Sequence, residues 1–315
     1  MPVLAVDLGG TCCRAGVADA TGTLLAEVTV ATGASNAASA LSECITSVLA
    51  AAAALSVVPK VAVIGVPAVL DPETGLASLG TNVSWERYNV RELLDRLLSI
   101  PYTLDNDVNL AAYGEAWRGA ASGGVSAFSV LSIGTGVGGA AMVNGTLWRG
   151  AHHAAGELGY LTTGDVGRNG PLPWLEQLIS GPAIRTRALA SAASGADSTD
   201  ADTPDVLAAA KSGDPTALAV VSDVLEHLAR AIANLTSVLD PELVILDGGV
   251  GRALAPWIGE LQGRIGELIP FAAKLVVSEL LPTAPLVGAV ERGLALLARY
   301  HPRVPVADGP GGSRG

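Results

Sequence analysis

Apolar residues occur along the chain either in short unbroken runs or at every third or fourth position of longer segments. The runs predict buried strands and the longer segments predict helices. In the first part of the chain, strands are predicted over residues 3–8, 13–18, 23–30, 61–66 and 102–104, and helices over residues 35–55 and 91–98. Residues 68–89 contain Asp-Pro and Gly punctuation and are predicted as a loop. The mixture predicts an α/β fold.

One arrangement of strands and turns occurs twice. Residues 4–25, LAVDLGGTCCRAGVADATGTLL, and residues 128–148, FSVLSIGTGVGGAAMVNGTLW, both follow the order strand, Gly-rich turn, strand, tight Gly-Thr turn and strand. Two copies of one unit predict two similar domains that face each other. A phosphate group between the domains would meet two glycine-rich turns, whose backbones it can approach closely.

The second copy contains Gly134-x-Gly136-x-x-Gly139, which formally matches the dinucleotide-binding fingerprint. That fingerprint requires a helix directly after the glycines, whereas AAMV and a turn follow here, so we reject the Rossmann interpretation. Further along, helices are predicted from near Trp174 and over residues 206–211, 216–239 and 287–300, and strands over residues 243–246 and 275–277. Residues 192–205 are predicted as a flexible loop and residues 301–315 as a disordered tail.

Four polar side chains lie where a short predicted strand turns into a helix: Asp105, Asn106, Asp107 and Asn109. Asp and Asn often cap helices by accepting hydrogen bonds from the first N–H groups, but one cap needs only one such residue. The surplus indicates a site, in which Asp107 would hold a substrate hydroxyl and take its proton as a general base.

Composition narrows the class of protein. Hydrophobic residues make up 50% and charged residues 16% of the 315 residues, which is typical of a soluble α/β protein. The formal net charge of −11, without a basic cluster, argues against nucleic-acid binding. The start lacks the features of a secretory signal, and the longest apolar stretch, residues 48–58, is too short to span a bilayer. The cysteines Cys12, Cys13 and Cys44 fit reduced cytoplasmic thiols.

The first glycine turn places the carboxylate of Asp7 at the end of a strand, beside the exposed backbone of Gly9, Gly10 and Thr11. A carboxylate there would repel a phosphate unless a cation lay between them, so the turn implies Mg²⁺. An ordinary hairpin with an Asp at its mouth has the same sequence, but the second glycine turn at residues 134–139 favours the phosphate interpretation.

At the level of ordered motifs, the chain resembles the ROK family (repressor, open reading frame, kinase) of sugar kinases, as a glucokinase-like member without the zinc motif. The motifs are DLGGT at 7–11, NDVN at 106–109, IGTGVGGA at 133–140, AGELGY at 155–160, WLEQLISGPAI at 174–184 and VILDGGV at 244–250. The resemblance implies a two-domain actin-like ATPase fold, related to ribonuclease H, with a cleft between the domains. It implies a small domain over residues 1–117 completed by a C-terminal helix over 288–301, a large domain over 118–287 and a flexible tail over 302–315.

The resemblance also implies roles for individual residues. Asp107 matches the catalytic base. The sugar-binding positions are Pro67, Ala68, Asn82, Asn106, Asp107, Glu157, Tyr160 and Glu176. The ATP-binding positions are Asp7, Gly9, Gly10, Thr11, Gly134, Thr135, Gly136, Gly138, Gly248 and Gly249, with Asp7 reaching Mg²⁺ through the nucleotide. Taken alone, Glu157 and Glu176 would be read as surface or capping carboxylates.

Two segments depart from the family pattern. Relatives commonly carry a zinc-binding His where this chain has Tyr160, and a Cys-rich segment where residues 167–176, GRNGPLPWLE, contain no Cys. We therefore expect no structural zinc, and packing of Tyr160, Pro171, Pro173 and Trp174 in its place. His152 and His153 are adjacent, so their side chains diverge and make poor joint ligands. Tyr160 also changes one wall of the expected sugar site.

These observations predict an ATP- and Mg²⁺-dependent kinase, cytoplasmic and homodimeric, that phosphorylates the primary hydroxyl of a hexose or hexose-like polyol. A C7-cyclitol kinase of the valiolone type is one alternative. A non-catalytic sugar-binding ROK protein is another; the family's repressors carry an extra helix-turn-helix domain, which we do not expect here because DLGGT begins at residue 7. No nucleic-acid or membrane partner is expected.

Overall fold

The computed structural model describes residues 1–32, 37–71, 74–75, 77–79, 89–163, 172–192, 202–280 and 282–300. The strands are β1 (Val3–Leu8), β2 (Cys12–Ala18), β3 (Leu24–Ala31), β4 (Val61–Val66), β5 (Val69–Leu70), β6 (Ala77–Leu79), β7 (Tyr102–Asn106), β8 (Phe128–Ile133), β9 (Val137–Val143), β10 (Thr146–Leu147), β11 (Leu243–Asp247) and β12 (Lys274–Val277). The helices are α1 (Ala37–Ala54), α2 (Val90–Leu97), α3 (Asp107–Arg118), α4 (Glu176–Ile179), α5 (Gly181–Ala192), α6 (Thr203–Lys211), α7 (Pro215–Leu239), α8 (Gly248–Ala253), α9 (Ile258–Leu268) and α10 (Ala284–Tyr300), with 3₁₀ turns η2 (Leu158–Tyr160) and η3 (Ala255–Trp257).

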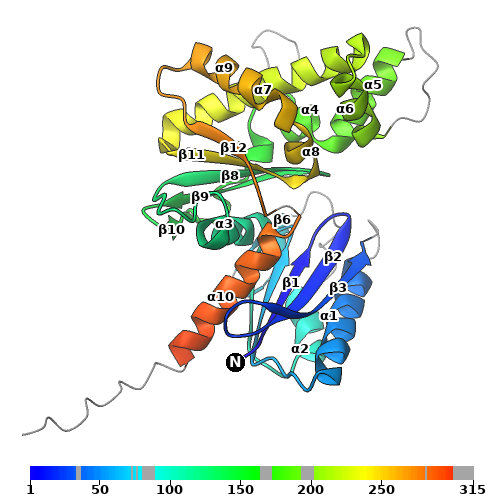
Figure 1. Ribbon diagram of the computed structural model, residues 1–315, viewed down its shortest axis with the longest axis vertical. Helices are drawn as coiled ribbons and strands as arrows, with labels where there is room; N and C mark the ends of the chain where they lie inside the picture. The colour runs from blue at the N-terminus through cyan, green and yellow to red at the C-terminus, as the bar shows by residue number, and fades with distance from the viewer. Residues whose placement is uncertain are drawn as a thin grey trace, which may run out of the picture.

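Two five-stranded sheets of the same design form the framework (Figure 1). Their strand orders are β3-β2-β1-β4-β7 and β10-β9-β8-β11-β12. In each sheet three antiparallel strands are followed by two parallel ones. The predicted repeat is therefore confirmed, and each copy builds the antiparallel part of one sheet.

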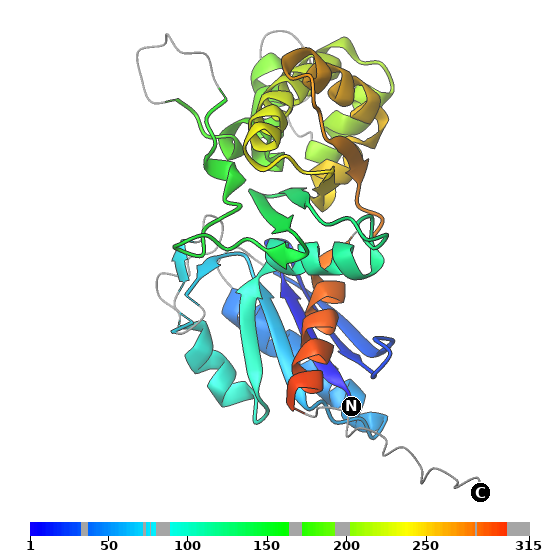
Figure 2. The same ribbon diagram turned by 90° about the vertical axis from the view of Figure 1, so that its left-hand side faces the viewer.

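Helix α3 lies between the two sheets (Figures 1 and 2). Val108, Ala111 and Ala112 pack against apolar side chains of β8, β9 and β11 in the second sheet. Leu110, on another side of the helix, packs against Ala5 of β1, Val63 of β4 and α10. Because both sheets bury it, α3 lacks the polar face of an ordinary surface helix.

Helix α10 crosses α3 at close range and covers one face of the first sheet (Figure 2). A Cβ atom built on Gly288 would lie 1.7 Å from the carbonyl oxygen of Leu110, and one on Gly114 would lie 2.3 Å from that of Ala284. Glycine is therefore required at both positions, because any side chain would push the helices apart. The opposite face of the sheet is covered by α1 and α2, which pack on β1, β2 and β4.

Alternation along the strands decides which side chains face α3. In β1, Leu4, Val6 and Leu8 point to the α1 side, so Ala5 and Asp7 point to the α3 side. In β11, Val244 and Leu246 join the core beneath α7, so Ile245 and Asp247 point to the α3 side. The two faces that enclose α3 thus each carry one aspartate at a strand end.

Helix α1 is apolar enough over its 18 residues to cross a membrane by length and composition alone, with a mean hydropathy of 1.5. In the structure Leu41, Cys44, Ile45 and Val48 are completely buried against the first sheet. We therefore interpret α1 as a core helix.

Most predicted elements are confirmed within a few residues at their ends. The rejection of the Rossmann interpretation is confirmed, because strand β9 and not a helix follows the second glycine turn. The prediction of a plain loop over residues 68–89 was wrong at β5 and β6, which pair as a short antiparallel hairpin. The helix predicted from near Trp174 is divided into α4 and α5, and α6 begins at Thr203, inside the predicted flexible loop.

Candidate active site

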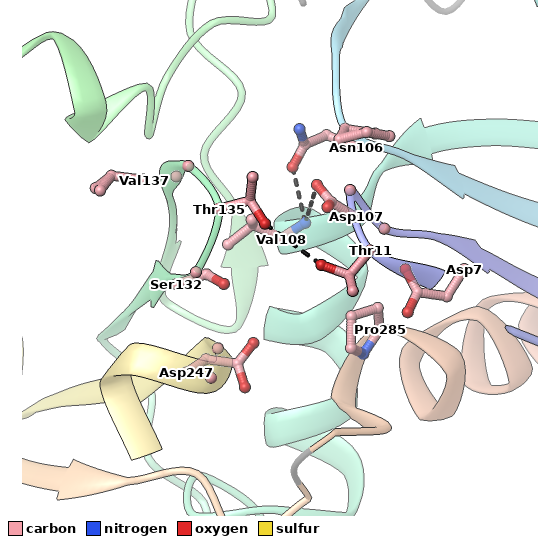
Figure 3. A pocket seen from close by; sticks show the side chains of 18 of the residues that line it. Asp7, Thr11, Asn106, Asp107, Val108, Ser132, Thr135, Val137, Asp247 and Pro285 are labelled. Carbon is pink, nitrogen blue, oxygen red and sulfur yellow. Dashed lines mark hydrogen bonds between the residues drawn. The ribbon is translucent and has the colours of Figure 1, made fainter. Parts of the chain in front are cut away.

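A cavity of about 360 Å³ opens beside the N-terminus of α3 and is lined by residues of both halves (Figure 3). The predicted site residues in its lining are Asp7, Gly9, Gly10, Thr11, Pro67, Ala68, Asn106, Asp107, Gly134, Thr135, Gly136, Gly138, Glu157, Tyr160, Glu176, Gly248 and Gly249. Asn82 lies outside the described residues. The structure thus brings together positions that are as much as 242 residues apart in the numbering, from Asp7 to Gly249.

The two glycine turns face each other across this cavity. The hydroxyl oxygens of Thr11 and Thr135 are 3.4 Å apart, and a Cβ built on Gly10 would lie 3.6 Å from Thr135 (Figure 3). Each turn is closed by a short backbone hydrogen bond, from Gly9 N to the Cys12 carbonyl and from Gly134 N to the Gly136 carbonyl, both at 2.9 Å. The two glycine turns therefore border one space.

The N-terminus of α3 reaches both turns. A Cβ on Gly65, which is paired with Asp7, would lie 3.5 Å from the Cα atom of Asp107. On the other side, a Cβ on Gly138 would lie 3.1 Å from the side chain of Val108. Asp107 therefore lies beside the strand ends of the first sheet, and the next residue, Val108, contacts the second sheet.

Asn106 supplies the helix cap. Its side-chain oxygen accepts hydrogen bonds from Val108 N at 2.9 Å and Asn109 N at 3.1 Å, and Asp107 Oδ1 also accepts from Val108 N at 2.9 Å (Figure 3). The amide nitrogen of Asn106 donates to the Ala68 carbonyl at 3.4 Å. The capping explanation is thus correct for Asn106, which also lines the cavity.

Asp105 and Asn109 are held by structural contacts. Arg149 donates two hydrogen bonds to the carboxylate of Asp105, at 2.9 and 2.6 Å, and Asn109 donates a third at 3.0 Å. This bidentate pair joins β7 of the first sheet to the segment after β10 of the second. It fixes the strand that leads to Asp107 relative to the segment that leads to Glu157.

Glu157 and Glu176 reach the cavity from the second half. The segment carrying Glu157 lies tightly on β9, since a Cβ on Gly156, whose φ is +97°, would meet the Gly139 carbonyl at 2.2 Å. Glu176 is the first residue of α4, and its Oε2 accepts a hydrogen bond from Val137 N at 2.9 Å. Two carboxylates with fixed backbones are thus available to hydrogen-bond several hydroxyl groups.

Tyr160 packs edge-to-face on Trp174, with ring centroids 4.8 Å apart. The backbone continues this contact, because Thr162 bridges to Trp174 and Leu175 N donates to the Leu161 carbonyl at 2.7 Å. These contacts join the segments of Glu157 and Glu176. Pro171, which was expected to contribute to this packing, lies outside the described residues.

Three aspartates, Asp7, Asp107 and Asp247, line the centre of the cavity. Burial, and next the charge of Asp107, raises the pKa of Asp7 to about 8, although Arg14 Nη1 lies 3.7 Å from its carboxylate. Burial raises the pKa of Asp107 to about 7, with Glu157 and Asp247 adding to the effect and the Val108 N–H opposing it. Burial likewise raises the pKa of Asp247 to about 6. Burial therefore favours the neutral, protonated form of these three carboxyl groups in the ligand-free cavity.

Several residues of the site were not predicted. Asp247, Ser132, Arg14 and Cys12 line the cavity, and Arg149 holds Asp105. Asp247 had a recognisable signal, because VILDGG resembles AVDLGG in placing an acid and two glycines at the end of a buried strand. Arg149 had no comparable signal, because its partner is 44 positions away in the sequence.

Comparisons with known proteins agree with this arrangement. The sequence model of the ROK family matches residues 3–276. A glucokinase from Halalkalibacterium halodurans is 31% identical over 203 residues, which are 60% of this chain and 61% of the relative. A glucokinase from Thermotoga maritima is 29% identical over 310 residues, 92% of this chain and 96% of the relative. The chain thus matches less than two thirds of the first relative and nearly all of the second.

The matches are not restricted to enzymes. A xylose repressor from Caldicellulosiruptor bescii is 31% identical over 194 residues, 58% of this chain and 48% of the repressor. Among solved structures, a ROK family glucokinase from Streptomyces griseus in complex with glucose and AMPPNP has a TM-score of 0.77 and 25% identity, covering 93% of this chain and 99% of that one. The actin-like two-domain fold is confirmed by such neighbours.

We expect the ligand-free protein to lose stability as the pH rises from about 6.5 to about 8. Asp7 and Asp107 bind protons in the folded state up to about pH 8 and 7, against a value of 3.8 for an unperturbed Asp. The folded state then holds more protons than the unfolded state, so its free energy of unfolding decreases by about 1.4 kcal/mol per pH unit for each extra proton. Urea denaturation at several pH values measures this slope.

The Asp107→Asn variant removes one of these titrating groups, so its stability should fall less steeply over the same range. His227, whose pKa burial lowers, is present in both proteins and therefore does not account for a difference between their slopes. A wild-type stability that rises with pH, or an equal slope in the variant, would contradict the assignment.

We also expect the purified protein to contain no stoichiometric zinc, since the contacts of Tyr160 and Trp174 join the segments that a metal would otherwise connect. Within the described ranges no group of three or more His, Cys, Asp or Glu side chains is arranged to hold a metal ion. Elemental analysis should detect far less than one zinc per chain, and chelator treatment should leave the melting temperature unchanged. One bound zinc per chain after dialysis against a chelator would refute this expectation.

Proposed function

The chain belongs to the ROK family, and on that premise we propose that it is an ATP-dependent kinase that phosphorylates the primary hydroxyl of a hexose or hexose-like polyol. The observation that carries the proposal is the position of Asp107, beside the meeting point of the two glycine turns and in a cavity that also receives Glu157 and Glu176. A carboxylate between a phosphate-binding space and a hydroxyl-binding space is the arrangement that a sugar kinase needs.

Asp107 acts as the general base in this proposal. It accepts the proton of the primary hydroxyl while that oxygen attacks the γ-phosphate of ATP, and ADP leaves. A pKa of about 7 suits the task, because a base with a pKa near the working pH combines a useful deprotonated fraction with proton affinity. Phosphoryl transfer otherwise depends mainly on positioning and charge neutralisation.

The remaining polar groups position the sugar. Glu157 and Glu176 accept hydrogen bonds from ring hydroxyls, and the NH₂ group of Asn106 donates one. The backbone at Pro67 and Ala68 and the ring of Tyr160 complete the wall of the proposed sugar site. Such a site selects substrates by the directions of their hydroxyls, because a missing hydroxyl leaves a buried polar group unpaired. Asn82 belongs to the proposed sugar contacts but lies outside the described residues.

The glycine turns hold the nucleotide phosphates, and Gly248 and Gly249 lie on the adenosine side. Oxygen ligands suit Mg²⁺, and the oxygens offered at this end of the cavity, from the Asp7 carboxylate and the Thr11 and Thr135 hydroxyls, fit it. When bound, the ion neutralises charge on the phosphates. Asp7 is the residue of the first sheet that would hold it, as part of the ATP complex. The protein acts as a cytoplasmic homodimer in this proposal.

A second possibility, a non-catalytic sugar-binding protein, is represented by the xylose repressor among the relatives. Retention of Asp7, Asp107 and both glycine turns supports catalysis, because sugar sensing alone requires neither a base nor a phosphate site. Sugar-dependent formation of ADP from ATP, measured with a panel of hexoses, N-acetylhexosamines and cyclitols, distinguishes the two.

The Asp107→Asn variant should lose about two or more orders of magnitude in kcat while binding sugar with nearly unchanged affinity. Asn keeps the size and can accept the hydrogen bond from Val108 N, so the helix start remains intact. Steady-state kinetics and isothermal titration with sugar measure the two effects.

The Asp240→Asn variant is the matched control, because it removes the same charge from an exposed position before β11. It should keep wild-type kinetics. Near wild-type kcat in Asp107→Asn would show that Asp107 is not the base. For the wild-type enzyme, kcat/KM should rise with pH through about 7, following ionisation of Asp107.

Tyr160 should set substrate preference on one side of the ring. We predict phosphorylation at the exocyclic primary hydroxyl, with relaxed preference at the wall formed by Tyr160, so that a cyclitol with a hydroxymethyl arm is also used. A Tyr160→His variant should change the ratio of kcat/KM for glucose to that for the cyclitol. An unchanged ratio would mean that Tyr160 serves only to pack against Trp174.

A further inference from the structure

We propose that Asp247 and Asp7 form an opposed pair of carboxylates, one from each sheet, that together hold the divalent cation of the bound nucleotide. The inference rests on the proposed nucleotide site and extends it to Asp247, a residue that the kinase proposal leaves without a role.

Asp247 is placed for this task by strand alternation. It is the last residue of β11, paired in register with Ser132 of β8, and its side chain is on the same face as Leu243 and Ile245, which pack against α3. Asp7 occupies the corresponding face of the first sheet, at the end of β1. Both line the cavity, on opposite sides of the space between the glycine turns (Figure 3).

The two halves differ in which strand supplies the carboxylate. In the repeat, Asp7-Leu8-Gly9 of β1 corresponds to Ser132-Ile133-Gly134 of β8, so the second copy has a hydroxyl where the first has an acid. The adjacent parallel strand, β11, then supplies Asp247 beside Ser132. The neighbour of Asp7 on the adjacent strand of the first sheet is Gly65. Each sheet therefore contributes one carboxylate at this level.

Asp247 is not satisfied by its protein surroundings. The residue is only 4% exposed, and within the described part of the chain its Oδ1 atom has no hydrogen-bond partner. A buried carboxylate oxygen without a partner is costly, which identifies it as a position that a ligand completes. The raised pKa of Asp247 has the same origin, first in burial, with the Gly248 N–H and the Ser132 hydroxyl opposing it.

The composition of the lining also favours a cation. Within the described residues, five carboxylates, those of Asp7, Asp107, Glu157, Glu176 and Asp247, line the cavity with one guanidinium group, that of Arg14. A nucleotide adds several negative charges. Mg²⁺ is commonly held by one or two carboxylates together with phosphate oxygens and water, so two aspartates suffice and no cluster of three protein ligands is needed. Arg14 is already the partner of Asp7, at 3.7 Å, so it does not balance the carboxylate of Asp247 on the second sheet.

The test compares wild-type protein with Asp247→Asn and with Asp240→Asn, the exposed control. Mn²⁺ replaces Mg²⁺, and its binding in the presence of AMPPNP is measured by electron paramagnetic resonance. We expect Asp247→Asn to weaken Mn²⁺ binding by about tenfold or more, the usual scale for groups around a metal, and Asp240→Asn to leave it unchanged.

Melting temperatures separate a cation role from a structural one. Without ligand, Asp247→Asn should melt at the same or a higher temperature than wild type, because it removes a buried charge, and it should gain less from Mg²⁺ with AMPPNP. A structural role predicts a lower melting temperature and an undiminished gain. As a rescue, Ser132→Asp combined with Asp247→Asn returns a carboxylate to the adjacent strand and should recover part of the lost Mn²⁺ affinity.

Unchanged Mn²⁺ affinity in Asp247→Asn overturns the inference, as does the absence of any Mn²⁺ binding by wild-type protein with AMPPNP. These outcomes are independent of sugar phosphorylation. If the wild-type protein phosphorylates sugars and Asp247→Asn retains its Mn²⁺ affinity, only this inference fails. If no sugar is phosphorylated but Mn²⁺ binding depends on Asp247, the kinase proposal fails and the cation site stands.

Discussion

The burial of α3 by both sheets is the contact on which the rest of the structure depends. One side of the helix completes the core of the second sheet through Val108, Ala111 and Ala112, and Leu110 completes that of the first. Gly114 and Gly288 let α10 approach so closely that the helix has little freedom to slide. Because Asp107 is the first residue of α3, its position between the glycine turns is a consequence of core packing rather than of loop conformation.

This packing brings carboxylates together at a considerable electrostatic cost. Asp7, Asp107 and Asp247 all face the region of α3, and each has a raised pKa because burial disfavours its charged form. A protein selected for stability alone would place apolar side chains at these strand ends. In the proposed complex, a cation and the hydroxyl groups of the sugar would compensate this cost. The free energy released by that compensation would then contribute to binding, so that ligand affinity and the instability of the empty cavity would have a common source.

The sequence was sufficient to predict the α/β class, the repeat, most strands and helices, and 17 of the 26 residues that line the cavity. The class, the repeat and the elements depend on local signals, which are unbroken apolar runs, glycine turns and an acid at the end of a strand, whereas residues such as Glu157 and Glu176 were identified only through the resemblance to the ROK family. The hairpin of β5 and β6 was missed because strands of two and three residues have no periodicity to detect. Arg149 was missed because its role is to bind Asp105, which lies on the other sheet. Asp247 was missed because its role depends on which face of β11 its side chain occupies. The partner of Arg149 is a tertiary contact that no local window contains, whereas the acid and two glycines that mark Asp247 were present in the sequence.

The position of α10 determines the order in which the protein matures on the ribosome. This helix is the last described element, yet it covers the sheet that begins at Val3, with Leu294 and Leu297 packed on Val3 and Val61. The nascent first sheet therefore lacks the cover of Leu294 and Leu297 over Val3 and Val61 until α10 has been translated. The usual sequence, in which the N-terminal unit folds first, is reversed in this respect, because the N-terminal sheet waits for the C-terminal helix.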